Sequence, residues 1–240
     1  VGFGWVGQAN AIALAKSGYD VSFFDINDPV LRYTDQYDTD YQNIKRVHEL
    51  NSVDDADVWY IVCVGDRVLD DGEQDISAIK KALESLEDLK GGVVLRSTIL
   101  PEKLDQLSFN YYVPEFLHEK KAVEESLLPQ YYVLGIKDES KGSPSFLELW
   151  ERSATKAFKG DPKEASHVKY ISNIWNAVRI AFTNEIGNTI KLPKGKDGVE
   201  DIEKIMYTNY YSYVMLSRLV VDHMKEQKSG HIVNITSGSV

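Results

Sequence analysis

Short apolar runs alternate with amphipathic segments along much of the chain. Five runs have the length and the β-branched or aromatic content of strands: residues 21–25, 58–64, 93–95, 111–113 and 131–134. The run at 58–64 is apolar throughout, as expected of a parallel strand that is covered on both faces. Because predicted strands alternate with predicted helices, the pattern indicates an α/β fold with a Rossmann-type, doubly wound parallel sheet.

Helical spacing occupies the segments between these runs. A first helix is expected to begin near Trp5 and to stop at Gly18. A second helix should follow Asp75, whose carboxylate can cap it, with apolar positions at Ile76, Ile79, Leu83 and Leu86. The polar segment 28–56 predicts only one short helix, near residues 43–50.

Residues 164–190 are predicted to form one long helix. Its apolar positions recur at steps of three and four: Val168, Ile171, Trp175, Val178, Phe182 and Ile186. A helix this apolar has to be covered by another surface, so we expect it to form a homodimer contact. Residues 191–201 have the composition of a linker, and a further helix and a strand at 231–235 follow. We therefore divide the chain into a domain at 1–163, the long helix at 164–190, the linker and a segment at 202–240.

Composition and charge narrow the classes of partner. The 240 residues carry a formal net charge of −10, which disfavours nucleic acid and anionic membrane surfaces. No apolar run approaches the roughly 20 residues of a membrane helix, and no signal peptide is visible, so we expect a cytoplasmic location. Cys63 is the single cysteine, and we predict no metal site.

A glycine motif opens the chain as Gly2-Phe3-Gly4-Trp5-Val6-Gly7. The three glycines suit a tight turn, a close approach of backbone to a pyrophosphate, and close packing of helix on strand. The phosphates would lie at the helix N-terminus, beside Trp5 and Val6. The alternative is a glycine-rich turn that binds no ligand.

Asp25 ends the next predicted strand, about 20 residues after the glycines, where an acid that binds the cofactor ribose is expected. Its charge would repel a 2′-phosphate, so the sequence favours NAD over NADP.

Three further motifs carry candidate chemistry. Ser97-Thr98 and the segment 113–119, which contains Glu115 and Glu119, each follow a predicted strand, where ligands bind in open α/β sheets. Lys169 and Asn173 are one helical turn apart, and such a pair can stabilise an oxyanion. The alternatives without function are a capped turn for Ser97-Thr98, surface acids for Glu115 and Glu119, and a solvated face of the helix for Lys169.

The order of these motifs resembles the UDP-glucose/GDP-mannose dehydrogenase family. The resemblance rests on GxGxxG, Asp25, Ser97-Thr98, Pro114-Glu115-Phe116-Leu117, Lys169 with Asn173, and the stretch 173–188, and it covers about residues 1–190. It implies oxidation of a nucleotide sugar, of UDP-glucose type, from alcohol to carboxylate with two NAD, and hence a place in polysaccharide biosynthesis.

The resemblance also implies a role for each matching residue. Lys169 and Asn173 would stabilise the oxyanion, Glu115 would assist thioester hydrolysis, and Thr98 would position a water. Phe116 and Leu117 would contact the substrate, as would Glu115, Lys169 and Asn173. Val64, Ser97, Thr98 and Glu119 would join the glycine turn and Asp25 at the cofactor.

Departures from the family pattern limit this interpretation. Nothing matches the family's nucleophilic cysteine, and Cys63 lies in an apolar predicted strand where a thiol stays protonated. Val64-Gly65-Asp66 stands where the family has Val-x-Thr-Pro. We expect the chain to be a truncated piece of such an enzyme and to be inactive alone.

The C-terminal segment resembles part of a short-chain dehydrogenase. Asn209 and Ser237 match that family's helix asparagine and catalytic serine, but no Tyr-x-x-x-Lys follows. A generic helix and strand is the alternative, and the strand at 231–235 could fill a gap in the first sheet. Two other functions stay open: a non-catalytic module that binds NAD or a partner, and a two-electron dehydrogenase of the 3-hydroxyacid type. The sequence does not name the sugar.

Overall fold

The computed structural model describes residues 1–190 and 226–227. The chain divides into two compact units, Val1–Ser172 and Asn173–Val240. The predictions for the linker at 191–201 and for the segment 202–240, including Asn209, Ser237 and the strand at 231–235, lie outside the described residues. The domain boundary at residue 163 stays a prediction.

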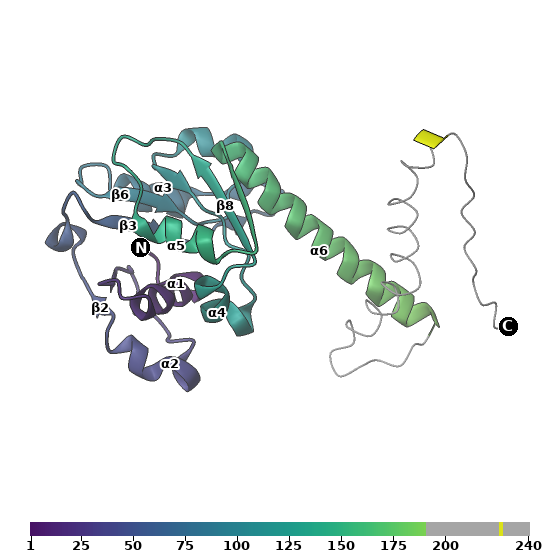
Figure 1. The fold of residues 1–240 in the computed structure, drawn as a ribbon, viewed down its shortest axis with the longest axis horizontal. Helices are drawn as coiled ribbons and strands as arrows, with labels where there is room; N and C mark the ends of the chain where they lie inside the picture. The colour runs from purple at the N-terminus through teal and green to yellow at the C-terminus, as the bar shows by residue number, and fades with distance from the viewer. Residues whose placement is uncertain (191–225, 228–240) are drawn as a thin grey trace. The chain divides into compact units, whose positions relative to one another are not determined.

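A five-stranded sheet forms the centre of the first unit (Figure 1). Its strands, in spatial order, are β3 (Trp59–Val62), β6 (Gly92–Leu95), β7 (Tyr111–Tyr112), β8 (Tyr131–Ile136) and β9 (Lys156–Gly160). Neighbouring strands are parallel except β7 and β8, which pair antiparallel. The predicted α/β fold with a mostly parallel sheet is confirmed.

Two shorter strands extend this sheet through the first residues of the chain. β1 (Ser22–Phe23) pairs with β2 (Lys45–Arg46) in parallel. The Val1 amine donates to the Ile61 carbonyl at 2.8 Å, and the Gly2 N–H donates to the Phe24 carbonyl at 3.0 Å. Val1 and Gly2 therefore join the five-stranded sheet to the two-stranded one, and the glycine turn begins at Gly2.

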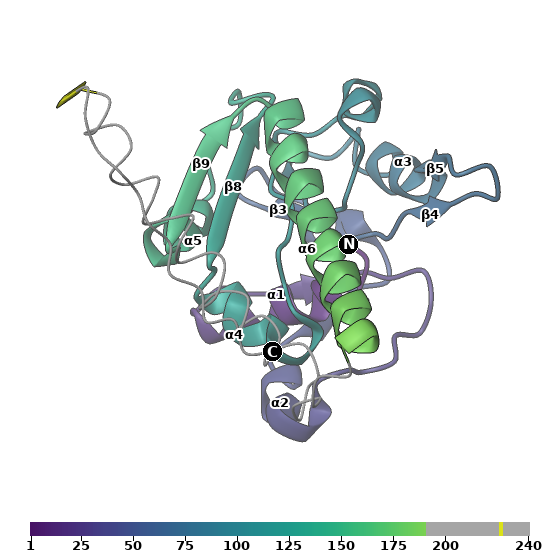
Figure 2. The ribbon, with the colours of Figure 1, turned by 90° about the vertical axis from the view of Figure 1, so that its right-hand side faces the viewer.

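Helices cover both faces of the strands (Figures 1 and 2). On one face α3 (Ser77–Glu84) and the first turns of α6 (Pro162–Ile190) pack on side chains of β3 and β6. On the other face α1 (Trp5–Lys16) and α5 (Ser145–Ser153) pack on β6, β7 and β8, and α4 (Ala122–Leu127) packs on α1. This two-faced cover explains why the central strands are apolar on both sides.

The prediction for residues 43–50 was wrong. The helix in this region is α2 (Thr34–Tyr41), and the residues after it form β2. Tyr33, Tyr37 and Tyr41, at steps of four, pack against the core cluster of α1, so the aromatic spacing decides the helix position. Asp75 was predicted to cap the next helix. Its Oδ1 accepts from the Ser77 N–H at 2.9 Å at the start of α3, but the N-cap residue is Ile76.

The long helix is confirmed as α6. The Asp161 carboxylate caps its start by accepting from the N–H groups of Lys163 and Glu164, at 2.7 and 3.0 Å. Ala165, Ser166 and Lys169 are buried in the first unit. In the second unit, the described apolar side chains of α6 at Ile174, Trp175, Val178, Ile180 and Phe182 are each about half exposed or more.

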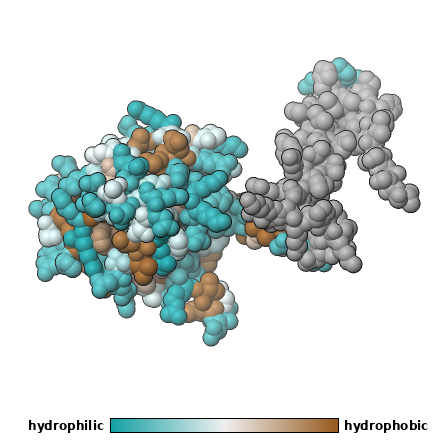
Figure 3. Space-filling view, turned by 90° about the horizontal axis from the view of Figure 1, so that it is seen from below, coloured by the Kyte–Doolittle hydropathy of each residue, from teal (hydrophilic) through white to brown (hydrophobic). Residues whose placement is uncertain are grey.

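The rest of the described surface carries both hydrophobic and hydrophilic residues. Figure 3 shows hydrophobic residues in small separate patches among hydrophilic ones on the face that it presents. Among the described residues, no helix is long and apolar enough to cross a membrane. The same part of the chain contains no group of three or more His, Cys, Asp or Glu side chains that could hold a metal ion.

Candidate cofactor and substrate site

The glycine turn is built by close backbone contacts. Gly2 has φ +82°, and a Cβ placed on Gly7 would lie 2.0 Å from the Gly2 carbonyl oxygen. The helix α1 can therefore approach the turn only because residue 7 has no side chain. Gly4 is the N-cap of α1 and has open space on its outer side. No side chain caps α1, so its first N–H groups are free to bind an anion such as a pyrophosphate.

Asp25 is held beside this turn. Its Oδ2 accepts from the Phe3 N–H at 2.7 Å and its Oδ1 accepts from the Asn27 N–H at 2.9 Å. Asp25 lies two residues after the end of β1 and is partly exposed, so its carboxylate can also accept hydrogen bonds from ribose hydroxyls. The open turn and this acid fit a dinucleotide with a free 2′-hydroxyl.

Aromatic and basic side chains line the outer end of the turn. Trp5 is 38% exposed, and the Arg32 guanidinium lies 4.9 Å from its ring centroid. The Tyr33 hydroxyl donates to the Trp5 carbonyl at 3.2 Å. Burial raises the pKa of Tyr33 to about 12, with a smaller contribution from the charge of Glu119. The predicted cofactor residue Glu119 is exposed at the start of a short helix, Glu119–Lys121, and its role stays a prediction.

The ends of β3 and β6 are joined at the predicted cofactor residues. The Ser97 hydroxyl donates to the Val64 carbonyl at 2.6 Å. Thr98, the next residue, is partly exposed. This hydrogen bond fixes the loop that carries Thr98 against the loop that follows β3.

The sequence analysis missed Gln74, which connects these loops. Its Nε2 donates to Asp66 Oδ2 at 2.6 Å, to the Thr98 carbonyl at 2.9 Å and to the Tyr170 hydroxyl at 3.3 Å. Its Oε1 accepts from the Leu100 N–H at 2.9 Å. Asp66, which departs from the family pattern, is thus a hydrogen-bond acceptor for Gln74, and a glutamine on a short strand gives no sequence signal for this role.

Lys169 and Glu115 form the most buried ion pair in the described part of the chain. The Lys169 side chain is 6% exposed, and its Nζ lies 3.1 Å from Glu115 Oε1. The Nζ also donates to the Glu115 carbonyl and lies 5.1 Å from the Phe116 ring centroid. Glu115 Oε2 accepts from the Leu117 N–H at 2.7 Å. The structure therefore brings together the predicted residues of segment 114–117 and the lysine of α6.

This pair is fixed next to the Thr98 loop. The Ser166 hydroxyl, one turn before Lys169, donates to the Ile99 carbonyl at 2.6 Å. Asn173 is exposed, follows Lys169 by one turn of α6 and opens the second unit. Its role at the oxyanion stays a prediction.

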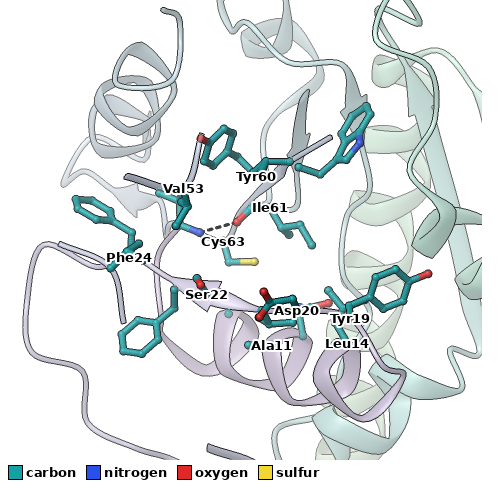
Figure 4. Close-up of a pocket in the computed structure, with 18 of the residues that line it drawn as sticks. Ala11, Leu14, Tyr19, Asp20, Ser22, Phe24, Val53, Tyr60, Ile61 and Cys63 are labelled. Atoms are coloured by element: carbon teal, nitrogen blue, oxygen red, sulfur yellow. Dashed lines mark hydrogen bonds between the residues drawn. The ribbon is translucent and has the colours of Figure 1, made fainter. Parts of the chain in front are cut away.

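A cavity of about 690 Å³ lies between β1 and β3 and is lined mostly by apolar side chains such as Leu14, Phe24 and Ile61 (Figure 4). Neither Lys169 nor Glu115 is among the residues that line it. Cys63 also lines it, and burial raises the pKa of the Cys63 thiol. A protonated thiol in this position is not a nucleophile, as the sequence analysis expected.

Two family models match different parts of the chain. A sequence model of the UDP-glucose/GDP-mannose dehydrogenase family, NAD binding domain, matches residues 1–153. A model of the short chain dehydrogenase family matches residues 165–239, a longer stretch than the predicted 202–240. Both predicted resemblances are confirmed, and the cofactor is NAD.

Individual relatives agree with the first match. GDP-mannose 6-dehydrogenase of Pseudomonas syringae pv. tomato is 25% identical over 241 residues, covering 85% of this chain and 55% of the relative. UDP-glucose 6-dehydrogenase of Campylobacter jejuni is 27% identical over 212 residues, covering 78% and 54%. The chain spans about half the length of the curated relatives that it matches.

Solved structures share the fold. A GDP-mannose dehydrogenase from Pseudomonas aeruginosa has a TM-score of 0.69 at 20% identity, covering 96% of this chain and 64% of that one. A UDP-glucose dehydrogenase from Pyrobaculum islandicum has a TM-score of 0.64 at 23% identity, covering 78% and 51%. Since the family model matches residues 1–153 of the 240, the chain belongs to the UDP-glucose/GDP-mannose dehydrogenase family, whose NAD-binding domain it contains.

Proposed function

We propose that this chain is the NAD-binding part of a nucleotide-sugar 6-dehydrogenase that oxidises a UDP-sugar alcohol to the carboxylate. The observation that carries the proposal is the buried Lys169–Glu115 pair, held by α6 and segment 114–117 next to the Thr98 loop. A buried ammonium group beside a carboxylate suits a reaction in which negative charge develops on a substrate oxygen.

Each residue has a proposed task. Bound NAD supplies a hydride acceptor. Lys169 holds the substrate oxygen as it gains charge, with Asn173 as a second donor. Glu115, fixed by the Lys169 ammonium and the Leu117 N–H, accepts a proton from water in the hydrolytic step, and Thr98 orients that water. Phe116 and Leu117 shape the sugar side of the site.

The thioester step that the family resemblance implies needs a cysteine thiolate, which Cys63 does not supply. Burial raises the pKa of this thiol, and Cys63 is the one cysteine of the chain. We therefore propose that these 240 residues bind NAD as a module without completing the four-electron oxidation. A two-electron oxidation, as in 3-hydroxyacid dehydrogenases, needs no thiol and is an alternative outcome of the turnover test.

Replacement of Asp25 by alanine is expected to weaken NAD binding by about tenfold or more, because a charged hydrogen bond to the ribose is lost. The preference for NAD over NADP should fall as well, since the repulsion of a 2′-phosphate disappears. Titration calorimetry with NAD, and with NADP as competitor, measures both effects. Asp28→Ala is the matched control, because Asp28 is an exposed acid of the same segment. Equal NAD affinity in Asp25→Ala and the unaltered chain contradicts the proposed site.

An assay of substrate turnover distinguishes the candidate functions. The chain is incubated with NAD and UDP-glucose, GDP-mannose or a 3-hydroxy acid while NADH absorbance is followed. NAD binding without NADH formation supports the module, and oxidation of a 3-hydroxy acid alone supports the two-electron alternative. Sustained four-electron oxidation of a nucleotide sugar by this chain contradicts the proposed inactivity.

We also propose that α6 forms a homodimer contact. Ile174, Trp175 and Val178 are each more than half exposed, and such apolar helix residues associate with a partner surface. Trp175→Glu is expected to convert a dimer into a monomer in sedimentation equilibrium at micromolar concentration. Asn184→Glu adds the same charge at an exposed polar position of α6 and should leave the dimer intact. A monomeric unaltered chain at that concentration rules out the contact.

A further inference from the structure

Arg96 is a buried cation in the loop that follows β6. The residue is 6% exposed, and its Nε has no hydrogen-bond partner there. Its guanidinium carbon lies 4.6 Å from the ring centroid of Trp150 in α5. A cation–π contact replaces only part of the lost hydration, so a buried guanidinium normally has an anionic or hydrogen-bonding partner as well.

A second unpartnered donor lies close by. The Tyr132 hydroxyl in β8 is also buried without a hydrogen-bond partner. Arg96 and Tyr132 line the same small cavity, together with Trp150. Two unsatisfied polar side chains at one cavity indicate a small ligand between them, because each such group is costly to leave unpaired.

The size of the cavity limits what that ligand is. Its volume is about 30 Å³, and one water-sized particle needs roughly 10–15 Å³ measured in the same way. A sugar is too large for this space. One or two water molecules, or one monoatomic ion, fit.

The nearby carboxylates are already bound to other groups. Glu125 lines the cavity, but its Oε2 accepts from the His118 N–H at 2.6 Å and its Oε1 lies 2.8 Å from His118 Nδ1. Glu115 is paired with Lys169. Arg96 therefore has no directly bound carboxylate within the described residues, and its unpartnered Nε can donate to an anion in the cavity.

We propose that this cavity binds one chloride-sized anion between the Arg96 guanidinium and the Tyr132 hydroxyl. Pro114, Phe116 and Leu117 form part of the cavity wall. The anion thus lies beneath the segment that carries Glu115, and its binding stabilises that segment. Phe116 and Leu117, which shape the proposed sugar side of the site, are part of the wall of this cavity.

Thermal unfolding of the 240-residue chain in chloride and in gluconate at equal ionic strength tests the proposal. Gluconate is too large for the cavity, so only chloride should give a saturable rise in Tm, of about 2–4 °C. Arg96→Met should remove the response and Tyr132→Phe should weaken it. Arg152→Met, which removes an exposed arginine of α5, is the matched control and should keep it.

Bromide shows the site directly and does not depend on whether Arg96→Met folds. Crystals of the unaltered chain grown in sodium bromide should show an anomalous peak between Arg96 and Tyr132, and crystals of Tyr132→Phe a weaker one. A water without anomalous signal at that place overturns the proposal. A Tm that does not distinguish chloride from gluconate, or an equal response in a folded Arg96→Met protein, overturns it as well.

Discussion

Gly7→Ala is expected to destabilise the chain by about 3 kcal/mol or more and to abolish measurable NAD binding. The added Cβ would lie 2.0 Å from the Gly2 carbonyl oxygen, far inside van der Waals contact. Because the obstructing atom belongs to the backbone, no side-chain rotation relieves the overlap. Either α1 moves away from the turn or the turn opens, and both changes displace the N–H groups that face the phosphates. Urea denaturation and NAD calorimetry measure the two effects.

Gly4→Ala is the matched variant for this prediction. Gly4 has φ −77°, which alanine adopts readily, and a Cβ there meets no atom within 4 Å. The fold should lose only about 1 kcal/mol, the cost of a poorer N-cap. NAD affinity should still fall about tenfold, since the methyl group occupies the side from which the pyrophosphate approaches. If Gly7→Ala is as stable as Gly4→Ala, the close approach of turn and helix is not present in solution. If both variants bind NAD normally, the glycine turn is not the cofactor site.

Local sequence signals were enough to predict the geometry of the glycine turn. The glycine spacing and Asp25 identify a turn whose geometry depends on a few adjacent residues, and the structure shows the required close approach and free helix end. The apolar runs likewise predicted the central strands, because burial on both faces leaves little choice of residue. The antiparallel direction of β8 could not be predicted, because strand direction depends on the connection and not on the strand's own residues.

Long-range partners could not be read from the sequence. Gln74 lies 24 residues from Thr98 and 96 from Tyr170, and its bonds to them form only after α6 packs on the sheet. Arg96 gives no sequence signal of its own, and its burial against Trp150 depends on the position of α5. The proximity of Glu115 to Lys169 followed from family resemblance, since a separation of 54 residues carries no geometric information of its own.

Lys169→Met is expected to destabilise the fold by about 3 kcal/mol, because it leaves the Glu115 carboxylate, 19% exposed, without its counter-charge. Methionine keeps most of the buried volume, so the loss reports the ion pair more than a cavity. The loss should be measured by urea denaturation with and without NAD. NAD affinity should change little, since the pair lies on the side proposed for the sugar, away from Asp25 and the glycine turn.

A double-mutant cycle separates the pair from the packing around it. Glu115→Gln is also expected to be destabilising, because the Lys169 ammonium is then buried without a carboxylate. The double variant Glu115→Gln/Lys169→Met should lose about 1–3 kcal/mol less than the sum of the two single changes, since the second replacement removes a group that is already unpaired. Lys163→Met, a change on the same helix as Lys169 that breaks an exposed pair with Asp105, is the control and should cost much less than Lys169→Met. Additive losses in the cycle would mean that Lys169 and Glu115 do not interact in solution. A coupling energy within the expected range, combined with unchanged NAD affinity, would mean that the pair is formed before any sugar binds and that α6 contributes a preorganised charge to the site.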